Sequence, residues 1–259
     1  MADHRGNVSP GGRPDPGQSA FDKGQQLYLA GSFDKALAAF QEATRLSPMF
    51  FKAHACAVDC LLRKGELDRG EKTAQELLER YNRDTDLGTA RAHAYLQRYR
   101  QRRKLREFES ADFNYNMAME FGAIATEATP GSSYAWLRKG EIILGKRTPR
   151  ASMEARSCFE RALAAERNWM TETRIGMIWY LSGWYPEAAK WLHEVSQTTP
   201  DRACTWYWLG RAQLASGNRG LAKRSLKKAV HLDRHYEEAL EALRECSLFG
   251  RIIGLFGRG

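Results

Sequence analysis

Long apolar runs are missing from this chain. No stretch comes near the roughly 18 consecutive apolar residues that a membrane-spanning helix needs. The first residues, MADHRGNVSPGGRPDPGQ, also lack the apolar core of a secretory signal, and their glycine and proline content predicts a disordered leader over residues 1–17. We therefore expect neither a membrane span nor export by the secretory route.

Cysteine is scarce as well. The five cysteines are an odd number spread along the chain: Cys56, Cys60, Cys158, Cys204 and Cys246. This pattern does not suit a disulfide framework and is typical of buried thiols in a reducing compartment, so we expect a cytoplasmic protein. Cys56 and Cys60 share one helical face with His54 nearby, but two thiols without a second close pair do not make a zinc site.

Catalytic motifs are absent from the sequence. There is no glycine-rich phosphate loop, no nucleophile elbow and no His-Glu-x-x-His pattern. His193, His231 and His235 lie on separate turns without a convergent pair of carboxylates. The sequence therefore predicts no catalytic residue, no metal site and no cofactor.

The residues that are present favour helices. The chain is 43% hydrophobic and 27% charged, which is ordinary for a globular protein. Alanine and leucine are abundant in the periodic segments while β-branched runs are few, so we expect an all-α fold. The formal charge of +9 suits nucleic acid, an anionic membrane surface or an acidic peptide as partner, or solubility alone.

A spacing of about 34 residues recurs along the chain. Gly31 and Gly65 stand at this interval, and so do Gly176 and Gly210 and three further pairs: Gly183 and Gly217, Ala188 and Ala222, Leu192 and Leu226. Such a period with small residues at fixed positions is typical of stacked helix-turn-helix units, which bury their apolar faces against one another.

These units resemble the tetratricopeptide repeat (TPR). The first unit carries Gly24, Ala36, Phe40, Ala43 and Pro48 at the family's marked positions, and the last unit reproduces the W-x-x-L-G opening with Trp206, Leu209 and Gly210. The resemblance implies a right-handed superhelix (an α-solenoid) with a concave groove. It also implies a non-catalytic scaffold that binds a peptide or protein partner.

The resemblance also divides the chain. Two TPR-like repeats are expected over 18–84, and a degenerate helical pair with a basic helix over 85–131. Three further repeats and a capping helix follow over 133–246, and a cationic, apolar tail over 247–259.

In this family the first helix of each repeat lines the groove. Carrying its inward positions over to the last three repeats predicts a peptide-binding set: Tyr134, Arg138, Glu141, Arg174, Met177, Tyr180, Tyr207, Trp208 and Arg211. Arginines beside tyrosine and tryptophan suit a carboxylate next to an apolar or aromatic peptide side chain. The alternative is that the arginines pair with acids such as Glu141 or Glu172 while the aromatic rings pack.

Two segments offer alternative functions. The run RYRQRRKLR predicts a nucleic-acid contact through phosphate neutralisation, carried by Arg98, Arg100, Arg102, Arg103, Lys104 and Arg106. Its competing interpretation is a solvated helix paired with Glu107, Glu109 and Asp112. If the tail is helical, it gathers an apolar face that suits a membrane surface or a docking site: Leu248, Phe249, Ile252, Ile253, Leu255 and Phe256. Its competing interpretation is a tail that folds back on the last helix.

Overall fold

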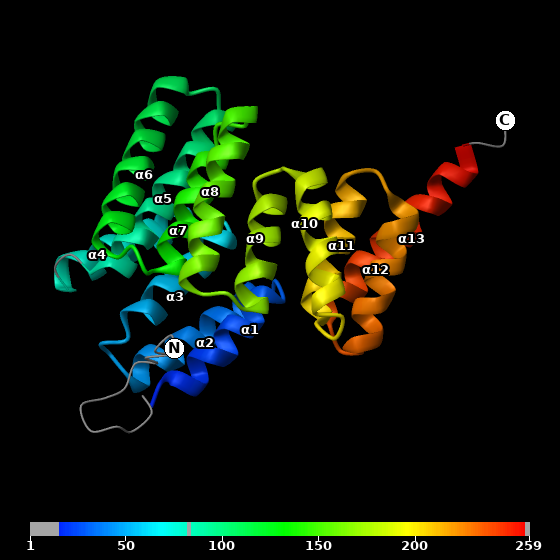
Figure 1. Ribbon diagram of the computed structural model, residues 1–259, viewed down its shortest axis with the longest axis horizontal. Coiled ribbons are helices and arrows are strands. Elements are labelled where there is room, and N and C mark those ends of the chain that lie inside the picture. Colours follow the sequence, from blue (N-terminus) through cyan, green and yellow to red (C-terminus); the bar gives the residue numbers. More distant parts are fainter. Residues whose placement is uncertain (1–15, 82–83, 257–259) are drawn as a thin grey trace. The chain divides into compact units, whose positions relative to one another are not determined.

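The computed structural model describes residues 16–81 and 84–256, with side chains described as far as Cys246. Within these ranges the regular structure is entirely helical, which confirms the all-α, helical-repeat fold class (Figure 1). The helices are α1 (Gln18–Leu29), α2 (Phe33–Leu46), α3 (Phe51–Arg63), α4 (Leu67–Tyr81), α5 (Thr85–Lys104), α6 (Phe108–Ala128), α7 (Ser133–Leu144), α8 (Pro149–Ala165), α9 (Trp169–Leu181), α10 (Tyr185–Thr198), α11 (Ala203–Ala215), α12 (Arg219–Leu232) and α13 (Glu237–Phe256). The predicted leader lies almost entirely outside the described residues.

Consecutive helices form antiparallel pairs joined by tight turns. Each turn needs one residue in the left-handed region, where glycine has no steric cost. Four turns use glycines with φ between 82° and 86°, and two use arginine: Gly31, Gly65, Gly183, Gly217, Arg106 (φ 61°) and Arg147 (φ 53°). The 34-residue spacing of the glycines is thus the spacing of the turns.

A second glycine position allows the two helices of a pair to approach closely. A Cβ atom on Gly176 would lie 2.3 Å from Leu192 Cγ, and one on Gly210 would lie 2.6 Å from Leu226 Cγ. Both distances are far below a van der Waals contact. The small residue that the repeat pattern marks in the first helix is therefore required by the leucine of the second helix.

The chain divides into two compact units. One spans Met1–Tyr28 and Ser32–Cys158, and the other spans Leu29–Gly31 and Phe159–Gly259. We refer to them as the N-terminal and C-terminal units.

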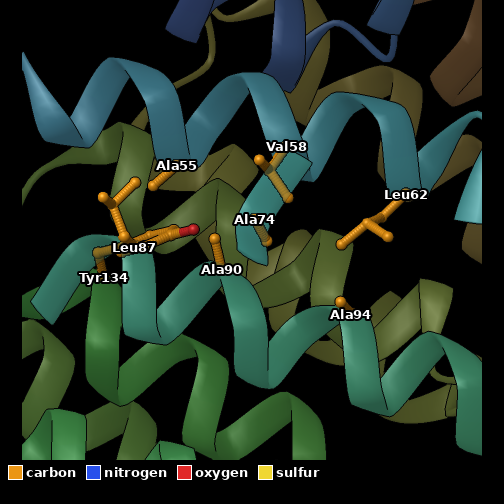
Figure 2. Close-up of a cluster of buried hydrophobic side chains, with 8 residues drawn as sticks. All are labelled: Ala55, Val58, Leu62, Ala74, Leu87, Ala90, Ala94 and Tyr134. Atoms are coloured by element: carbon orange, nitrogen blue, oxygen red, sulfur yellow. The ribbon is translucent and has the colours of Figure 1, made fainter. Parts of the chain in front are cut away.

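The core of the N-terminal unit lies between its helix pairs. Figure 2 shows Ala55 of α3 beside Leu87 of α5 and, further along the same helices, Leu62 facing Ala94; Ala74 of α4 belongs to the same cluster. A fully buried leucine such as Leu87 contributes about 1.5–3 kcal/mol relative to an exposed one.

Helices α5 and α6 are longer than the others of the N-terminal unit, with 20 and 21 residues. They pack along each other through rings: Tyr99 lies 5.2 Å from Tyr115, and Tyr95 stacks 5.7 Å from Phe121, measured between centroids. This pair carries no clear repeat signature in its sequence, yet it packs against α7 through Ile142 as a repeat would.

The C-terminal unit contains α9 to α13, and α13 packs against α12 and α11 (Figure 1). The ring of Phe159 meets Trp179 edge to face at 5.5 Å. Across the described ranges of both units, every helix is too short or too polar to serve as a transmembrane span.

Candidate functional site

Ionisable side chains are buried on the first helices of the N-terminal unit. Asp59 of α3, His93 of α5 and Glu141 of α7 are at most 1% exposed, and Arg138 of α7 is 3% exposed. Charged groups are almost never buried this deeply unless they are paired. We call this set, with its partners Tyr28, Arg63, Arg100 and Tyr134, the buried ion network.

Asp59 is one centre of the network. Its Oδ1 lies 2.7 Å from His93 Nδ1, while its Oδ2 accepts from Tyr134 Oη at 2.9 Å and from Arg138 Nη2. The second ring nitrogen of His93 accepts from the amide of Gln97 at 2.7 Å. A neutral imidazole that donates from Nδ1 and accepts at Nε2 satisfies both contacts.

Glu141 is the other centre, and it is held by three arginines. Its Oε2 accepts from Arg138 Nη1 at 2.6 Å and from Arg63 Nη2 at 2.7 Å, and its Oε1 accepts from Arg100 Nη1 at 3.2 Å. Arg63 and Arg138 also donate to Tyr28 Oη of α1, each at 3.2 Å. The network therefore joins all four first helices of the unit.

The protonation states follow from these contacts. Burial alone would raise the pKa of Asp59, but Arg138 and His93 outweigh it and hold the pKa below its usual value. Burial opposes ionisation of Glu141 too, yet Arg63, His93 and Arg138 hold its pKa well below normal. Burial and the positive charge of Arg138 lower the pKa of His93 to about 4.

At neutral pH the network therefore contains three guanidinium groups, two carboxylates and a neutral imidazole. Both ring nitrogens of that imidazole are engaged, and both carboxylates stay ionised. This arrangement supplies fixed charge and cross-linking between helices. It offers no group poised to exchange a proton near neutrality.

Three of the predicted peptide-binding residues, Tyr134, Arg138 and Glu141, lie inside this network. Arg138 pairs with Glu141, as the alternative interpretation supposed, and also with Asp59. These side chains hold the helices together and are covered by other atoms, with exposed fractions of 4% or less.

The C-terminal unit brings four predicted residues together, three of them in an aromatic row. Along it, ring centroids of neighbouring residues lie 4.9 to 5.5 Å apart, in the order Tyr185, Tyr180, Trp208, Tyr207 and Tyr236. Arg211 of α11 completes the cluster, because its Nε donates to Tyr180 Oη at 3.2 Å.

Exposure differs along the aromatic row. Tyr207 and Trp208 are buried, while Tyr180 is partly exposed and Tyr185 is 37% exposed. Arg211 keeps 29% of its side chain exposed, and its Nη1 lies 3.1 Å from Glu245 Oε2, a carboxylate that is itself 46% exposed.

The remaining two predicted residues lie on α9. Met177 is fully buried and is a core residue of the C-terminal unit, whereas Arg174 is partly exposed. Of the predicted residues in the cluster, Tyr180 and Arg211 are thus the two that reach the surface together. Arg174 lies on the same helix as Tyr180.

The basic run of α5 is largely paired. Arg98 contacts Asp68 and Glu71 of α4, and Arg100 contacts Glu141. Another pair joins Arg102 to Glu107.

Of the other basic residues in the run, Arg103 lies over the ring of Phe108 at 4.9 Å, and Lys104 and Arg106 are exposed at the end of the helix and in the turn. The sequence predicts the acid that meets Arg102, but it does not predict the acids of α4 that meet Arg98. A cavity of about 460 Å³ opens beside this contact, lined by acidic residues of α4 and by Arg98.

The two remaining predictions concern the apolar tail and the metal ligands. Helix α13 continues as far as Phe256, but the apolar side chains of the tail from Leu248 onwards lie outside the described residues. In the part of the chain that is described, no three His, Cys, Asp or Glu side chains gather as a metal site would require. Cys56 and Cys60 are both buried, and burial raises the pKa of the Cys60 thiol.

The sequence does contain a signal for the network. Asp59 and His93 are 34 residues apart, so they occupy the same position in successive repeats, and Glu141 occupies it in the next. The peptide-binding prediction covers only the last three repeats. The same inward position in the second and third repeats is occupied by Asp59 and His93, which places them beside Glu141.

The helix pairs and their turns define the class of the protein: a helical-repeat scaffold. Residues 27–94 match the family model described as tetratricopeptide repeat. The matched segment, residues 27–94, therefore carries tetratricopeptide repeats. No curated protein matches the sequence.

Several solved structures are similar at low identity. The thermophilic TPR protein TTC0263 of Thermus thermophilus shares 19% identity over 90% of this chain and 99% of its own, with a TM-score of 0.45. The pilF protein of Pseudomonas aeruginosa shares 17% over 89% and 97%, with a TM-score of 0.39. YrrB, a TPR protein described as having an unusual peptide-binding site, shares 16% over 87% and 90%, with a TM-score of 0.32.

Proposed function

We propose that this chain is a non-catalytic scaffold that binds an acidic peptide segment of a partner protein on the aromatic row of its C-terminal unit. Proteins with tetratricopeptide repeats are protein-interaction scaffolds, and that general class is the starting point. The observation that carries the finer proposal is Arg211, which is partly exposed and held against the Tyr180 ring.

Charge and burial support this choice of surface over the buried ion network. In the network both carboxylates are buried and bound by arginines, so a ligand would have to displace buried ion pairs at a cost of several kcal/mol. On the aromatic row the only ion pair of Arg211 with a described residue is to the half-exposed Glu245. Surface pairs of this kind contribute about 0–1 kcal/mol, so exchange is inexpensive.

The binding step follows from this exchange. A carboxylate of the peptide replaces Glu245 at the guanidinium of Arg211, and a neighbouring apolar side chain packs on the exposed edges of Tyr180 and Tyr185. Aromatic and arginine side chains dominate protein interfaces for this reason. Because the helices are already folded, little conformational entropy is lost by the scaffold.

Reciprocal variants test the exchange. Peptides are first selected on the wild-type protein from a displayed library of random sequences, and their affinities are measured by fluorescence anisotropy. Arg211→Ala removes a charged hydrogen bond of about 1.5–3 kcal/mol and should weaken the selected acidic peptides by roughly 10- to 100-fold. Glu245→Gln removes the internal competitor and should strengthen them.

Arg167→Ala is the matched control, because Arg167 is exposed and its contact with Glu172 is long, at 3.9 Å. This variant should leave the affinity unchanged. A library that yields no acidic binders, or binders that tolerate Arg211→Ala, would show that the peptide site is elsewhere.

A further inference from the structure

Helix α12 has a composition unlike that of any other helix in the described ranges. Its sequence, RGLAKRSLKKAVHL, contains five lysines and arginines and no acid. Its buried face is made by Ala222, Ser225, Leu226 and Ala229, which pack into the C-terminal unit. The basic residues therefore lie on the opposite, exposed face.

Four of these basic residues form what we call the α12 basic face: Lys223, Arg224, Lys227 and Lys228. All four are exposed, and none makes an ion pair with a carboxylate of the described residues. The run on α5 is the instructive contrast, because Arg98, Arg100 and Arg102 all contact acids. The positive charge of the α12 basic face is thus uncompensated, although its basic residues are less conspicuous in the sequence than the consecutive run on α5.

The spacing of the charges suits a phosphate backbone. The pairs 223/224 and 227/228 are one turn apart, which is about 6 Å along the helix axis at 1.5 Å per residue. Each strand of a duplex carries one phosphate per about 3.4 Å of axis, so successive pairs meet every second phosphate. His231 continues the exposed face by one more turn.

Aromatic and large apolar side chains are scarce on the α12 basic face, and this narrows the choice of partner. Helix α12 has no aromatic residue, and Leu221, which is 44% exposed, is its single large apolar side chain on the surface. Insertion into a lipid interface needs an apolar face, and stable protein docking needs apolar or aromatic anchors. Single-stranded nucleic acid needs aromatic platforms for its bases. A duplex backbone needs positive charge alone.

We propose that the α12 basic face binds the phosphodiester backbone of duplex nucleic acid without regard to sequence. This goes beyond peptide binding and uses a different surface, since α12 is the second helix of its pair (Figure 1). Four neutralised phosphates release about four counterions, so the logarithm of the affinity should fall against the logarithm of salt with a slope of about −3 to −4.

The test is fluorescence anisotropy with labelled 20-base-pair DNA and RNA duplexes at about 50 and 200 mM salt, where this slope predicts a loss of roughly a hundredfold. A fourfold variant, Lys223→Gln, Arg224→Gln, Lys227→Gln and Lys228→Gln, should lose at least tenfold in affinity at the lower salt. Glutamine keeps helix propensity, and circular dichroism checks that the variant is folded.

The matched control removes the same number of charges from the end of α5 and its turn: Arg102→Gln, Arg103→Gln, Lys104→Gln and Arg106→Gln. It should keep the wild-type affinity for the duplex. Binding to both duplexes or to one supports the proposal and identifies the nucleic acid.

Several results would overturn the proposal. Equal loss in both variants would mean that net charge alone attracts the duplex, and loss in the control alone would move the contact to α5. No binding by the wild type would also end the proposal. Binding to phosphatidylserine vesicles in place of duplex would assign the face to a membrane, and salt-sensitive self-association would assign it to a second copy of the chain.

Discussion

The buried imidazole of His93 makes a quantitative prediction about pH. In the folded protein its pKa is about 4, because burial and Arg138 oppose the charged form, while an unfolded histidine titrates near 6.5. Between pH 4 and pH 6.5 the histidine is therefore protonated in the unfolded chain and neutral in the folded chain. The stability from His93 is therefore fully present above about pH 6.5 and is lost as the pH falls through 4.

The size of the effect follows from the two pKa values. Between pH 7 and pH 5 the N-terminal unit should lose about 2 kcal/mol through this one residue, a large part of a typical domain stability of about 5–15 kcal/mol. Asp59 and Glu141, whose pKa values are lowered, contribute stability that is lost mainly at still lower pH. They therefore add little to this interval.

The assay is hydrogen exchange of the amides of α3 and α5, supported by urea denaturation followed by circular dichroism. His93→Gln cannot titrate, so its loss between pH 7 and pH 5 should be smaller than that of the wild type by about 2 kcal/mol, whatever its stability at pH 7. His193→Gln, at an exposed position, is the matched control. An equal pH dependence in wild type and His93→Gln would refute the buried, neutral histidine.

Three further predictions concern stability. Asp59→Asn should cost about 3–5 kcal/mol in urea denaturation, because it leaves Arg138 with an uncompensated buried charge, and a cost below 1 kcal/mol would contradict the network. Arg147→Gly should raise the stability by up to about 1 kcal/mol because the turn residue has φ 53°, while Gly65→Ala should lower it by a similar amount although its Cβ meets nothing. Gly176→Ala should cost about 1–3 kcal/mol against Leu192, whereas Gly220→Ala, in open space on α12, should be neutral or stabilising. Both pairs of variants are measured by thermal melts. A destabilising Arg147→Gly would contradict strain in the turn, and a neutral Gly176→Ala would show that the two helices approach less closely than described.

The repeat spacing was enough to predict the helical pairs and their turns. Gly31 and Gly65 mark turns because only a residue without Cβ adopts φ above 80° at no cost, and that requirement is local. The pairing of α5 with α6 depends on Tyr99 meeting Tyr115, a contact between helices that no short pattern encodes. The sequence therefore predicts α5 and α6 only as a degenerate helical pair without a repeat signature.

The candidate site was harder to predict, because charge pairing depends on which helices meet. The consecutive basic run was conspicuous, yet Arg98 is neutralised by Asp68, 30 residues away in the sequence. The basic residues of α12 come in two pairs separated by the buried Ser225 and Leu226, so they do not form an unbroken run, and they keep their charge. Arg138 was assigned to a groove because the identity of its partner Asp59, 79 residues away, depends on the stacking of the repeats.

The contact between Tyr28 and Arg138 has a consequence for how the N-terminal unit folds. Repeat arrays ordinarily behave as chains of nearest neighbours, in which each repeat can unravel at an end without disturbing the rest. Here a tyrosine of the first helix pair meets an arginine 110 residues later, in the fourth pair. Ordering that contact requires a long loop to close, which slows folding and discourages fraying at the ends. The unit should consequently melt as a single block and resist truncation by whole repeats.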